Sequence, residues 1–172
     1  MASLILKMGH PLLKCESLEV EQFNCPELFS LAKQLLNVQA EYAGAGLSAP
    51  QLGFNQRVIC FGGKTPRYAD SDAAQPIVLI NPQLFPQGKV MIEGWEGCLS
   101  VPGLRGLVAR YEIVEYRGYD VFGKKICGVV SGFLARALQH ECDHLDGILF
   151  PERIQNLKHF GYEETMAVSH MA

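Results

Sequence analysis

The chain has 172 residues and a formal net charge of −3, with 48% hydrophobic and 19% charged residues. This length fits one domain with a substantial core, so we expect residues 1–172 to form a single domain. Because the charge is slightly acidic and no basic block occurs, neither DNA nor an anionic membrane is expected as the main partner.

The opening apolar stretch, residues 4–6, is short and is followed by Lys7 and Gly9. It is too short for a secretory signal, and no stretch reaches the length of a membrane span. The six cysteines are scattered instead of densely spaced, which favours a reducing, cytoplasmic compartment with free thiols. We expect those that bind no metal to lie in the core.

Residues 26–42 are predicted to form the first helix. Pro26 follows Asn24-Cys25 and suits the first helical turn, where its missing N–H is not needed. Apolar side chains then recur at helical spacing, at Leu28, Leu31, Leu35 and Val38. We expect this helix to supply core and to carry no chemistry.

Small residues dominate the next segment, GAGLSAPQ at positions 44–51. Its glycines and proline make it a poor helix or central strand, but glycine lets backbone approach a ligand closely. The amide of Gln51 could donate to an oxyanion. A plain connection between a helix and a strand, without function, would have the same composition.

Short strands are predicted for the middle of the chain, with few helices between them. This pattern favours antiparallel sheets over βαβ units. A turn is expected at Asn81-Pro82 and a hairpin turn at 122–124, whereas a short, weakly amphipathic helix is expected after Pro151. The predicted strands are 57–61, 77–80, 89–93, a partly alternating run at 107–119, and 125–130, with a loop at 62–75.

Two histidines, His140 and His144, stand four residues apart, with Glu141 directly after the first. On a helix this spacing puts both imidazoles on one face, where they can share a metal ion. Glu141 is rotated from that axis by about 100°, which suits a general base that does not ligate the metal. Ser131 is a plausible N-cap of this helix, and Gly147 is a plausible residue just beyond its end.

The apolar positions of this helix form two neighbouring stripes. Phe133 and Ala137 share the stripe of the two histidines, so the metal face should look into a cavity with core on both sides. An H-E-x-x-H motif can also arise by chance in a core helix, so a metal site needs further support. The second stripe consists of Leu134, Leu138, Cys142 and Leu145.

A third ligand is available in the segment EGCLS at positions 96–100, between two predicted strands. Catalytic metal sites commonly use three protein ligands and leave one position to water. The thiolate of Cys98 would complete the set with the two histidines. Cysteine is also common in cores, so this residue is not specific on its own.

Three segments, GAGLSAPQ (44–51), EGCLS (96–100) and QHECDH (139–144), resemble the three signature motifs of peptide deformylases in order and approximate spacing. ILKMGHP (5–11) and the extension QHECDHLDG are also similar to that family. The resemblance implies an α+β fold, with antiparallel β-sheets packed around a central helix that carries the H-E-x-x-H metal motif. It implies an enzyme that removes the formyl group from N-formylmethionine on nascent polypeptides.

The resemblance also assigns roles to residues. Cys98, His140 and His144 would ligate one divalent metal, and Glu141 would act as general base and then as acid. One thiolate and two imidazoles suit Zn²⁺, Fe²⁺ or Ni²⁺. The family favours Fe²⁺ in the cell, with Zn²⁺ or Ni²⁺ in preparations. Formylated nascent peptides and a transient ribosome contact are the partners that the resemblance implies.

Further roles concern the oxyanion and the substrate. The resemblance implies that Gln51 and the backbone N–H of Leu99 stabilise the oxyanion, while Gly46 offers backbone hydrogen bonds to the substrate. Ser48 departs from the family, which more commonly has alanine there, and we expect no change of reaction from it. An extended peptide could pair with the backbone near Gly46 by strand addition.

The substrate pocket is expected at Phe133 and Ala137, which face the correct way for a methionine side chain. Arg136, one turn before His140, either rims this pocket or points to solvent. Two further arginines follow the cysteine segment, and Asp143 is expected on the helix surface. Arg105 would meet peptide carbonyls and Arg110 would pair with Glu96, unless both form ordinary ion pairs.

Two other kinds of protein share parts of this pattern. A metzincin needs a third histidine where Phe150 stands, whereas a metalloprotease with a downstream glutamate ligand could use Glu163 or Glu164. The latter would leave Cys98 and the glycine segment unexplained. A closed structural metal site would need a fourth ligand, and the candidate histidines His159 and His170 have no motif spacing.

Overall fold

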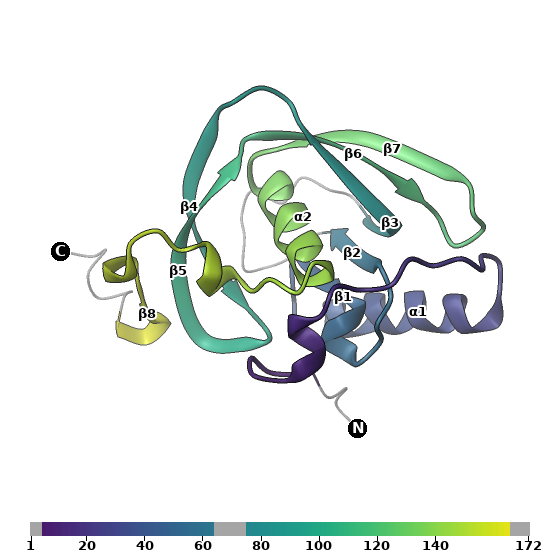
Figure 1. Ribbon diagram of the computed structural model, residues 1–172, viewed down its shortest axis with the longest axis horizontal. Helices are drawn as coiled ribbons and strands as arrows, with labels where there is room; N and C mark the ends of the chain where they lie inside the picture. The colour runs from purple at the N-terminus through teal and green to yellow at the C-terminus, as the bar shows by residue number, and fades with distance from the viewer. Residues whose placement is uncertain (1–4, 64–74, 166–172) are drawn as a thin grey trace.

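In the computed structural model, which describes residues 5–63 and 75–165, two antiparallel sheets and one further helix are arranged around a central helix (Figure 1). The central helix is α2, and it lies between the β4–β5 ribbon and strands β1 and β2. The predicted α+β class with antiparallel pairing is confirmed. The elements are α1 (Pro26–Glu41), β1 (Gly46–Ser48), β2 (Val58–Gly62), β3 (Pro76–Pro86), β4 (Met91–Cys98), β5 (Val101–Tyr111), β6 (Ile113–Tyr119), β7 (Lys125–Ser131), α2 (Gly132–Leu145) and β8 (Phe160–Tyr162).

Helix α2 carries the H-E-x-x-H motif within the predicted limits. Ser131 occupies the N-cap position, although its hydroxyl makes no capping hydrogen bond. Beyond the helix, Gly147 adopts a φ of 71°, the left-handed conformation that ends helices. A Cβ on Gly147 would also lie 2.7 Å from the carbonyl carbon of Lys14, so no larger residue fits there. All residues of α2 from Ala137 to Leu145 are buried.

The larger sheet has the strand order β1-β2-β3-β6-β7, and the smaller sheet has the order β4-β5-β8. Strand β1 is therefore an edge strand, in which Gly46 pairs with Phe61 of β2. The glycine segment is thus neither a helix nor a central strand, as expected, and it continues after β1 into a 3₁₀ turn, Ala49–Leu52. An edge strand leaves backbone groups available for pairing with another chain.

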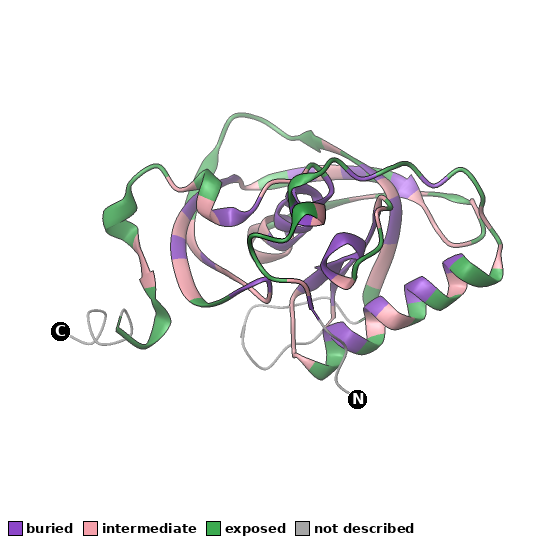
Figure 2. Ribbon diagram, turned by 60° about the horizontal axis from the view of Figure 1, so that its bottom comes forward, coloured by how far each residue is buried: buried purple, intermediate pink, exposed green. Residues whose placement is uncertain are grey.

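Apolar side chains fill the space on two sides of the larger sheet. Leu28, Leu31, Leu35 and Val38 of α1 pack on one side with Val58 of β2, which confirms the predicted core face of this helix. On the other side, the apolar stripe of α2 packs against β2 and β3. Figure 2 shows this division, with α1 buried on its inner face and exposed on its outer face.

Two predicted strand boundaries are wrong. Asn81-Pro82 does not form a turn: strand β3 continues through it with a change of register between Ile80 and Gln83. The side-chain amide of Asn81 accepts from the N–H of Val20 and donates to its carbonyl, so both backbone polar groups of Val20 are paired. The predicted run 107–119 is in fact divided between β5 and β6.

The end of the chain also differs from its prediction. In place of one helix after Pro151, the described part has 3₁₀ turns at Phe150–Arg153 and Leu157–His159, followed by β8. Strand β8 pairs with β5, so this segment forms an edge strand of the smaller sheet. Most of the loop predicted at 62–75 and the last seven residues lie outside the described residues.

Candidate metal centre and active site

Cys98, His140 and His144 converge at one point between β4 and α2. Their ligand atoms all lie within 4.8 Å of one another. The sulfur of Cys98 is 3.3 Å from Nε2 of His144, and the two imidazole centroids are 5.1 Å apart. Within the described residues, no other group of three histidine, cysteine or acidic side chains has this arrangement. The donor set fits a divalent metal that accepts sulfur and nitrogen.

The β4–β5 hairpin brings Cys98 to the histidines. Cys98 is the last residue of β4, so it belongs to a strand and not to the connection between strands. The pairing shifts after Gly97, and Cys98 then faces Val101 across a tight turn. The N–H of Ser100 in that turn donates to the sulfur of Cys98 at 3.4 Å, which favours a thiolate.

Electrostatics at Cys98 also favour its role as a metal ligand. Burial alone would raise the pKa of Cys98, but the neighbouring His144 and His140 outweigh burial and lower that pKa well below its usual value. Since the thiolate is the form that binds metal, the site holds Cys98 in its ligating state. Burial likewise disfavours charge on His140, yet contacts with Cys98 and Glu96 raise its pKa.

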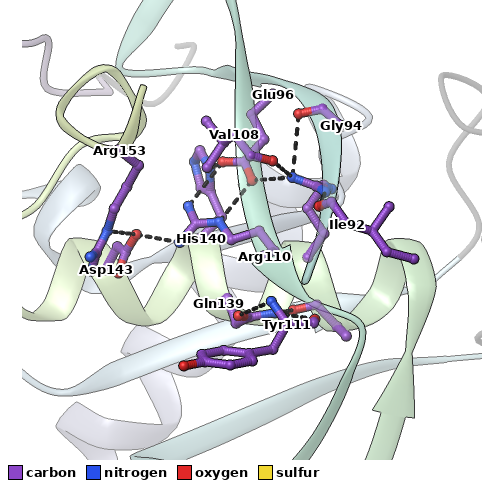
Figure 3. A network of polar contacts seen from close by, with 12 residues as sticks. Ile92, Gly94, Glu96, Val108, Arg110, Tyr111, Gln139, His140, Asp143 and Arg153 are labelled. Carbon is purple, nitrogen blue, oxygen red and sulfur yellow. Dashed lines mark hydrogen bonds and ion pairs between the residues drawn. The ribbon is translucent and has the colours of Figure 1, made fainter. Parts of the chain in front are cut away.

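Glu96 orients the imidazole ring of His140 through a hydrogen bond. Its carboxylate accepts from Nδ1 of His140 at 2.9 Å (Figure 3). Although burial opposes ionisation of Glu96, hydrogen bonds from Arg110 and His140 hold its pKa far below the usual value, so the carboxylate is ionised and only accepts. Nδ1 therefore carries a proton, and Nε2 is the nitrogen through which His140 can ligate a metal.

Two arginines compensate the buried charge of Glu96. Arg110 donates to both carboxylate oxygens, at 2.8 and 3.0 Å, which confirms the predicted pair. Arg110 also donates to Asp143 at 2.6 Å, and Arg153 donates to Asp143 at 2.7 Å. The expectation that Asp143 serves the helix surface is wrong, because Asp143 is buried within this charge network.

Arg136 joins the same network from one turn before His140. It donates to Glu96 at 2.9 Å and lines the cavity together with His140. The sequence left open whether Arg136 rims the pocket or points to solvent. The second orientation is wrong, since the Arg136 side chain is only 12% exposed.

Glu141 lies beside the metal cluster without being part of it. Burial raises the pKa of its carboxyl to about 7, although the nearby histidines partly oppose the shift. Its Oε2 is fully buried and has no hydrogen-bond partner in the described structure. A buried carboxyl with a pKa near neutrality and a free oxygen is suited to transfer a proton.

Gln51 is held by the residues on both sides of it. Its Oε1 accepts from the N–H of Ser48 at 2.9 Å and from the hydroxyl of Ser48 at 3.0 Å. Its amide nitrogen therefore points the other way, toward Ser100 at 3.1 Å and the sulfur of Cys98 at 3.6 Å. The amide donor of Gln51 is thus fixed beside the metal cluster.

A cavity of about 340 Å³ opens over these groups. Arg105 forms an ion pair with Glu163 at 2.7 Å on its rim, and Lys7 donates to the carbonyl of Leu99 at 2.7 Å. Sequence reasoning missed Lys7, Ser100 and the Glu96–His140 contact, and only the proximity of Glu96 to Cys98 in the chain hinted at the last. Every residue predicted to contact substrate or oxyanion lines this cavity: Gly46, Gln51, Leu99, Arg105, Phe133 and Ala137.

The residues of the competing interpretations lie elsewhere. Glu163 pairs with Arg105 and Glu164 is exposed, so neither belongs to the metal cluster. The ring of His159 lies beside Trp95, and His170 is outside the described residues. Among the other cysteines, Cys60 and Cys142 are buried, Cys25 is partly buried, and Cys15 and Cys127 are exposed, so the core prediction is wrong for the last two.

A cysteine and two histidines that converge beside a buried glutamate, in an antiparallel α+β fold, define a metal-dependent hydrolase. The polypeptide deformylase family matches residues 2–160 of the chain. The chain therefore belongs to this family, and it is an enzyme that removes the formyl group from N-formylmethionine at the start of nascent polypeptides.

Relatives and solved structures agree with this assignment. Peptide deformylase 1 of Nitrosomonas europaea is 49% identical over 94% of this chain and 93% of its own length. Peptide deformylase 2 of Ralstonia nicotianae is 47% identical over 94% of this chain and 92% of its own length. The Met-Ala-Ser-bound class I type b peptide deformylase of Acinetobacter baumannii superposes with a TM-score of 0.84 at 38% identity, covering 90% of this chain and 100% of that one. No helix in the described residues is both long and apolar enough to span a membrane.

Proposed function

We propose that Cys98, His140 and His144 hold one divalent metal ion and that Glu141 is the general base of deformylation. The convergence of the three donors within 4.8 Å, beside a buried glutamate that is not one of them, carries this proposal. When bound, such an ion supplies an activated water at neutral pH and polarises a carbonyl oxygen. The remaining chemistry belongs to side chains and backbone groups of this chain.

Deformylation requires a proton to move from water to the departing amine. Glu141 accepts the proton as the water oxygen attacks the formyl carbon, and its pKa of about 7 suits this exchange. The carbonyl oxygen becomes an oxyanion, which the amide of Gln51 and the N–H of Leu99 stabilise by roughly 3–4 kcal/mol per donor. Glu141 then gives the proton to the amine as the C–N bond breaks, and formate and a free N-terminus leave.

The peptide is proposed to lie along the edge of β1. The backbone of Gly46 pairs with it by strand addition, because an edge strand offers unpaired backbone groups. Phe133 and Ala137 receive the methionine side chain along α2. Arg105 contacts a peptide carbonyl once the substrate separates its guanidinium from Glu163, an exposed partner whose ion pair costs little to break.

The cellular setting is proposed on similar grounds. We infer Fe²⁺ as the ion in the cell, with Zn²⁺ or Ni²⁺ able to replace it in preparations, because the Cys-His-His donor set suits all three. The chain works as a single domain in the cytoplasm, where it meets formylated nascent peptides through transient ribosome contact. The slightly acidic charge supports a role without DNA or membrane binding.

Formate release from formyl-Met-Ala-Ser by anaerobically purified protein tests this function, with metal analysis of the same sample. One metal ion per chain and formate as product are expected. Cleavage of internal bonds in an unformylated peptide, without formate release, would instead support a metalloprotease. A fully loaded protein that releases no formate would refute the proposal.

A further inference from the structure

Arg136 places a positively charged group at the side of the substrate cavity. Its side chain belongs to α2 and is bonded to the β4–β5 ribbon. It lies four residues before His140 on the same face of α2. Its guanidinium donates to the carbonyl of Ile92 at 2.6 Å and to that of Val108 at 2.7 Å, in β4 and β5. With the further bond to Glu96, these contacts hold the group rigidly against the sheet.

Gly94 makes room for this arrangement. A Cβ on Gly94 would lie 2.8 Å from Cζ of Arg136 and 2.9 Å from its Nε. The backbone of Gly94 has no positive φ, so glycine is needed there for space and not for conformation. The guanidinium therefore lies directly on the backbone of β4, and the pair Gly94–Arg136 sets the shape of this side of the cavity.

The guanidinium keeps unused donor capacity. All its hydrogen bonds involve Nη1 and Nη2, and no described residue accepts from Nε. Nε is also not among the fully buried polar atoms without a hydrogen-bond partner, so it keeps some exposure, and Arg136 is one of the residues that line the cavity. Those fully buried atoms belong to Ser17, Gln39, Asn55, Glu141 and His144.

Two apolar side chains of α2, Phe133 and Ala137, line the same cavity beside Arg136. An arginine with a free N–H in such a pocket favours a ligand that brings an electron-rich atom to it. The thioether of methionine is a weak acceptor, and the oxygen of methionine sulfoxide is a strong one. Norleucine has the same length but offers no acceptor.

We propose that Arg136 makes the pocket select an unbranched first side chain with a hydrogen-bond acceptor, so that formyl-methionine sulfoxide peptides are also substrates. This inference rests on the proposed function, because it assigns the same cavity to the first side chain of the formylated peptide. It predicts that the enzyme also deformylates nascent chains whose first methionine has been oxidised.

The test compares three formylated tripeptides, X-Ala-Ser with X as methionine, methionine sulfoxide or norleucine. Wild-type enzyme is expected to process the sulfoxide at least as efficiently as the norleucine peptide, measured as kcat/KM for formate release. In Arg136→Met the sulfoxide-to-norleucine ratio is expected to fall by about five- to a hundredfold, the range expected when a buried acceptor loses its partner. Calorimetric affinities of the three deformylated tripeptides should change in the same order.

Arg57→Met provides a matched control. Arg57 is about as buried as Arg136, with 15% of its side chain exposed, but it pairs with Asp146 and lies outside this cavity. The substrate ratio should stay at the wild-type value in this variant. If Arg136→Met does not fold, Gly94→Ala replaces it, because the new Cβ displaces the guanidinium without removing it; the ratio should fall there too.

The outcomes separate the two proposals. If wild-type enzyme releases no formate from the methionine peptide, the proposed function fails. If it releases formate but the sulfoxide-to-norleucine ratio is unchanged in Arg136→Met or in Gly94→Ala, the selective role of Arg136 is overturned. A uniform loss of activity on all three peptides overturns it equally, because it would mean that Arg136 only supports Glu96.

Discussion

Glycine at position 46 is predicted to be required because Glu141 occupies the space of its missing side chain. A Cβ built on Gly46 would lie 2.6 Å from Cγ of Glu141 and 2.8 Å from its Oε1. Carbon atoms in contact normally stay about 3.5–4.0 Å apart, so Gly46→Ala must move the glutamate by about 1 Å. The clash involves the stem of the side chain, so rotating the carboxylate alone would not relieve it.

The expected cost follows from this displacement. Misplacing a catalytic group by about 1 Å can slow a reaction about a hundredfold, which corresponds to about 2.7 kcal/mol of transition-state stabilisation. We therefore expect Gly46→Ala to lower kcat/KM about a hundredfold, mainly through kcat, since the backbone groups of residue 46 remain. Metal content and melting temperature should stay close to those of the wild type.

Steady-state formate release, metal analysis and thermal unfolding together provide the assay. Gly44→Ala is the control within the same segment, because its Cβ would come no closer than 3.2 Å to any neighbour and should cost far less activity. The double variant Gly46→Ala/Glu141→Asp should lose less activity than the two single losses combined, since aspartate is shorter. A Gly46→Ala enzyme with normal kcat and a raised KM would show that Gly46 contributes only to substrate binding.

Three further substitutions test the other parts of the site. Glu141→Gln should fold and bind one metal but lose deformylation by at least ~10²–10⁴-fold, and near-normal single-turnover formate release would refute its role as base. Cys98→Ala should lose the metal in mass spectrometry, whereas Cys15→Ala and Cys60→Ala should retain it; stoichiometric metal without Cys98 would contradict the ligand assignment. Gln51→Ala should lower kcat with little change in KM, because its amide meets charge that forms only in the transition state, and the reverse pattern would make it a binding residue.

Local chemistry made the central helix and the metal centre predictable from sequence. Helical spacing fixes His140 and His144 on one face, and Gly147 ends the helix because its conformation is left-handed. The need for a third ligand then pointed to Cys98, which the fold brings within 3.3 Å of His144. These inferences depend on short-range geometry, which the sequence encodes directly.

Features that depend on distant partners were predicted less well. A turn was expected at Asn81 because asparagine before proline commonly starts one. Instead, the side chain of Asn81 bonds to Val20, which lies 61 residues earlier, and the strand continues. The C-terminal segment likewise joins β5 as strand β8, since pairing with an existing sheet edge outweighs its weak helical pattern. Neither partner is identifiable from the local sequence.

The charge network around Glu96 illustrates why a buried position cannot be deduced from one residue. An aspartate is usually exposed, and burying a lone aspartate at position 143 would cost several kcal/mol. Burial becomes acceptable only because Arg110 bridges Asp143 to Glu96, and Arg153 covers the remaining oxygen. Because Glu96 also fixes the proton on Nδ1 of His140, the same ion pairs that make burial tolerable also prepare Nε2 for the metal. The position of Asp143 and the readiness of the metal ligand are therefore two consequences of one contact between α2 and the β4–β5 ribbon.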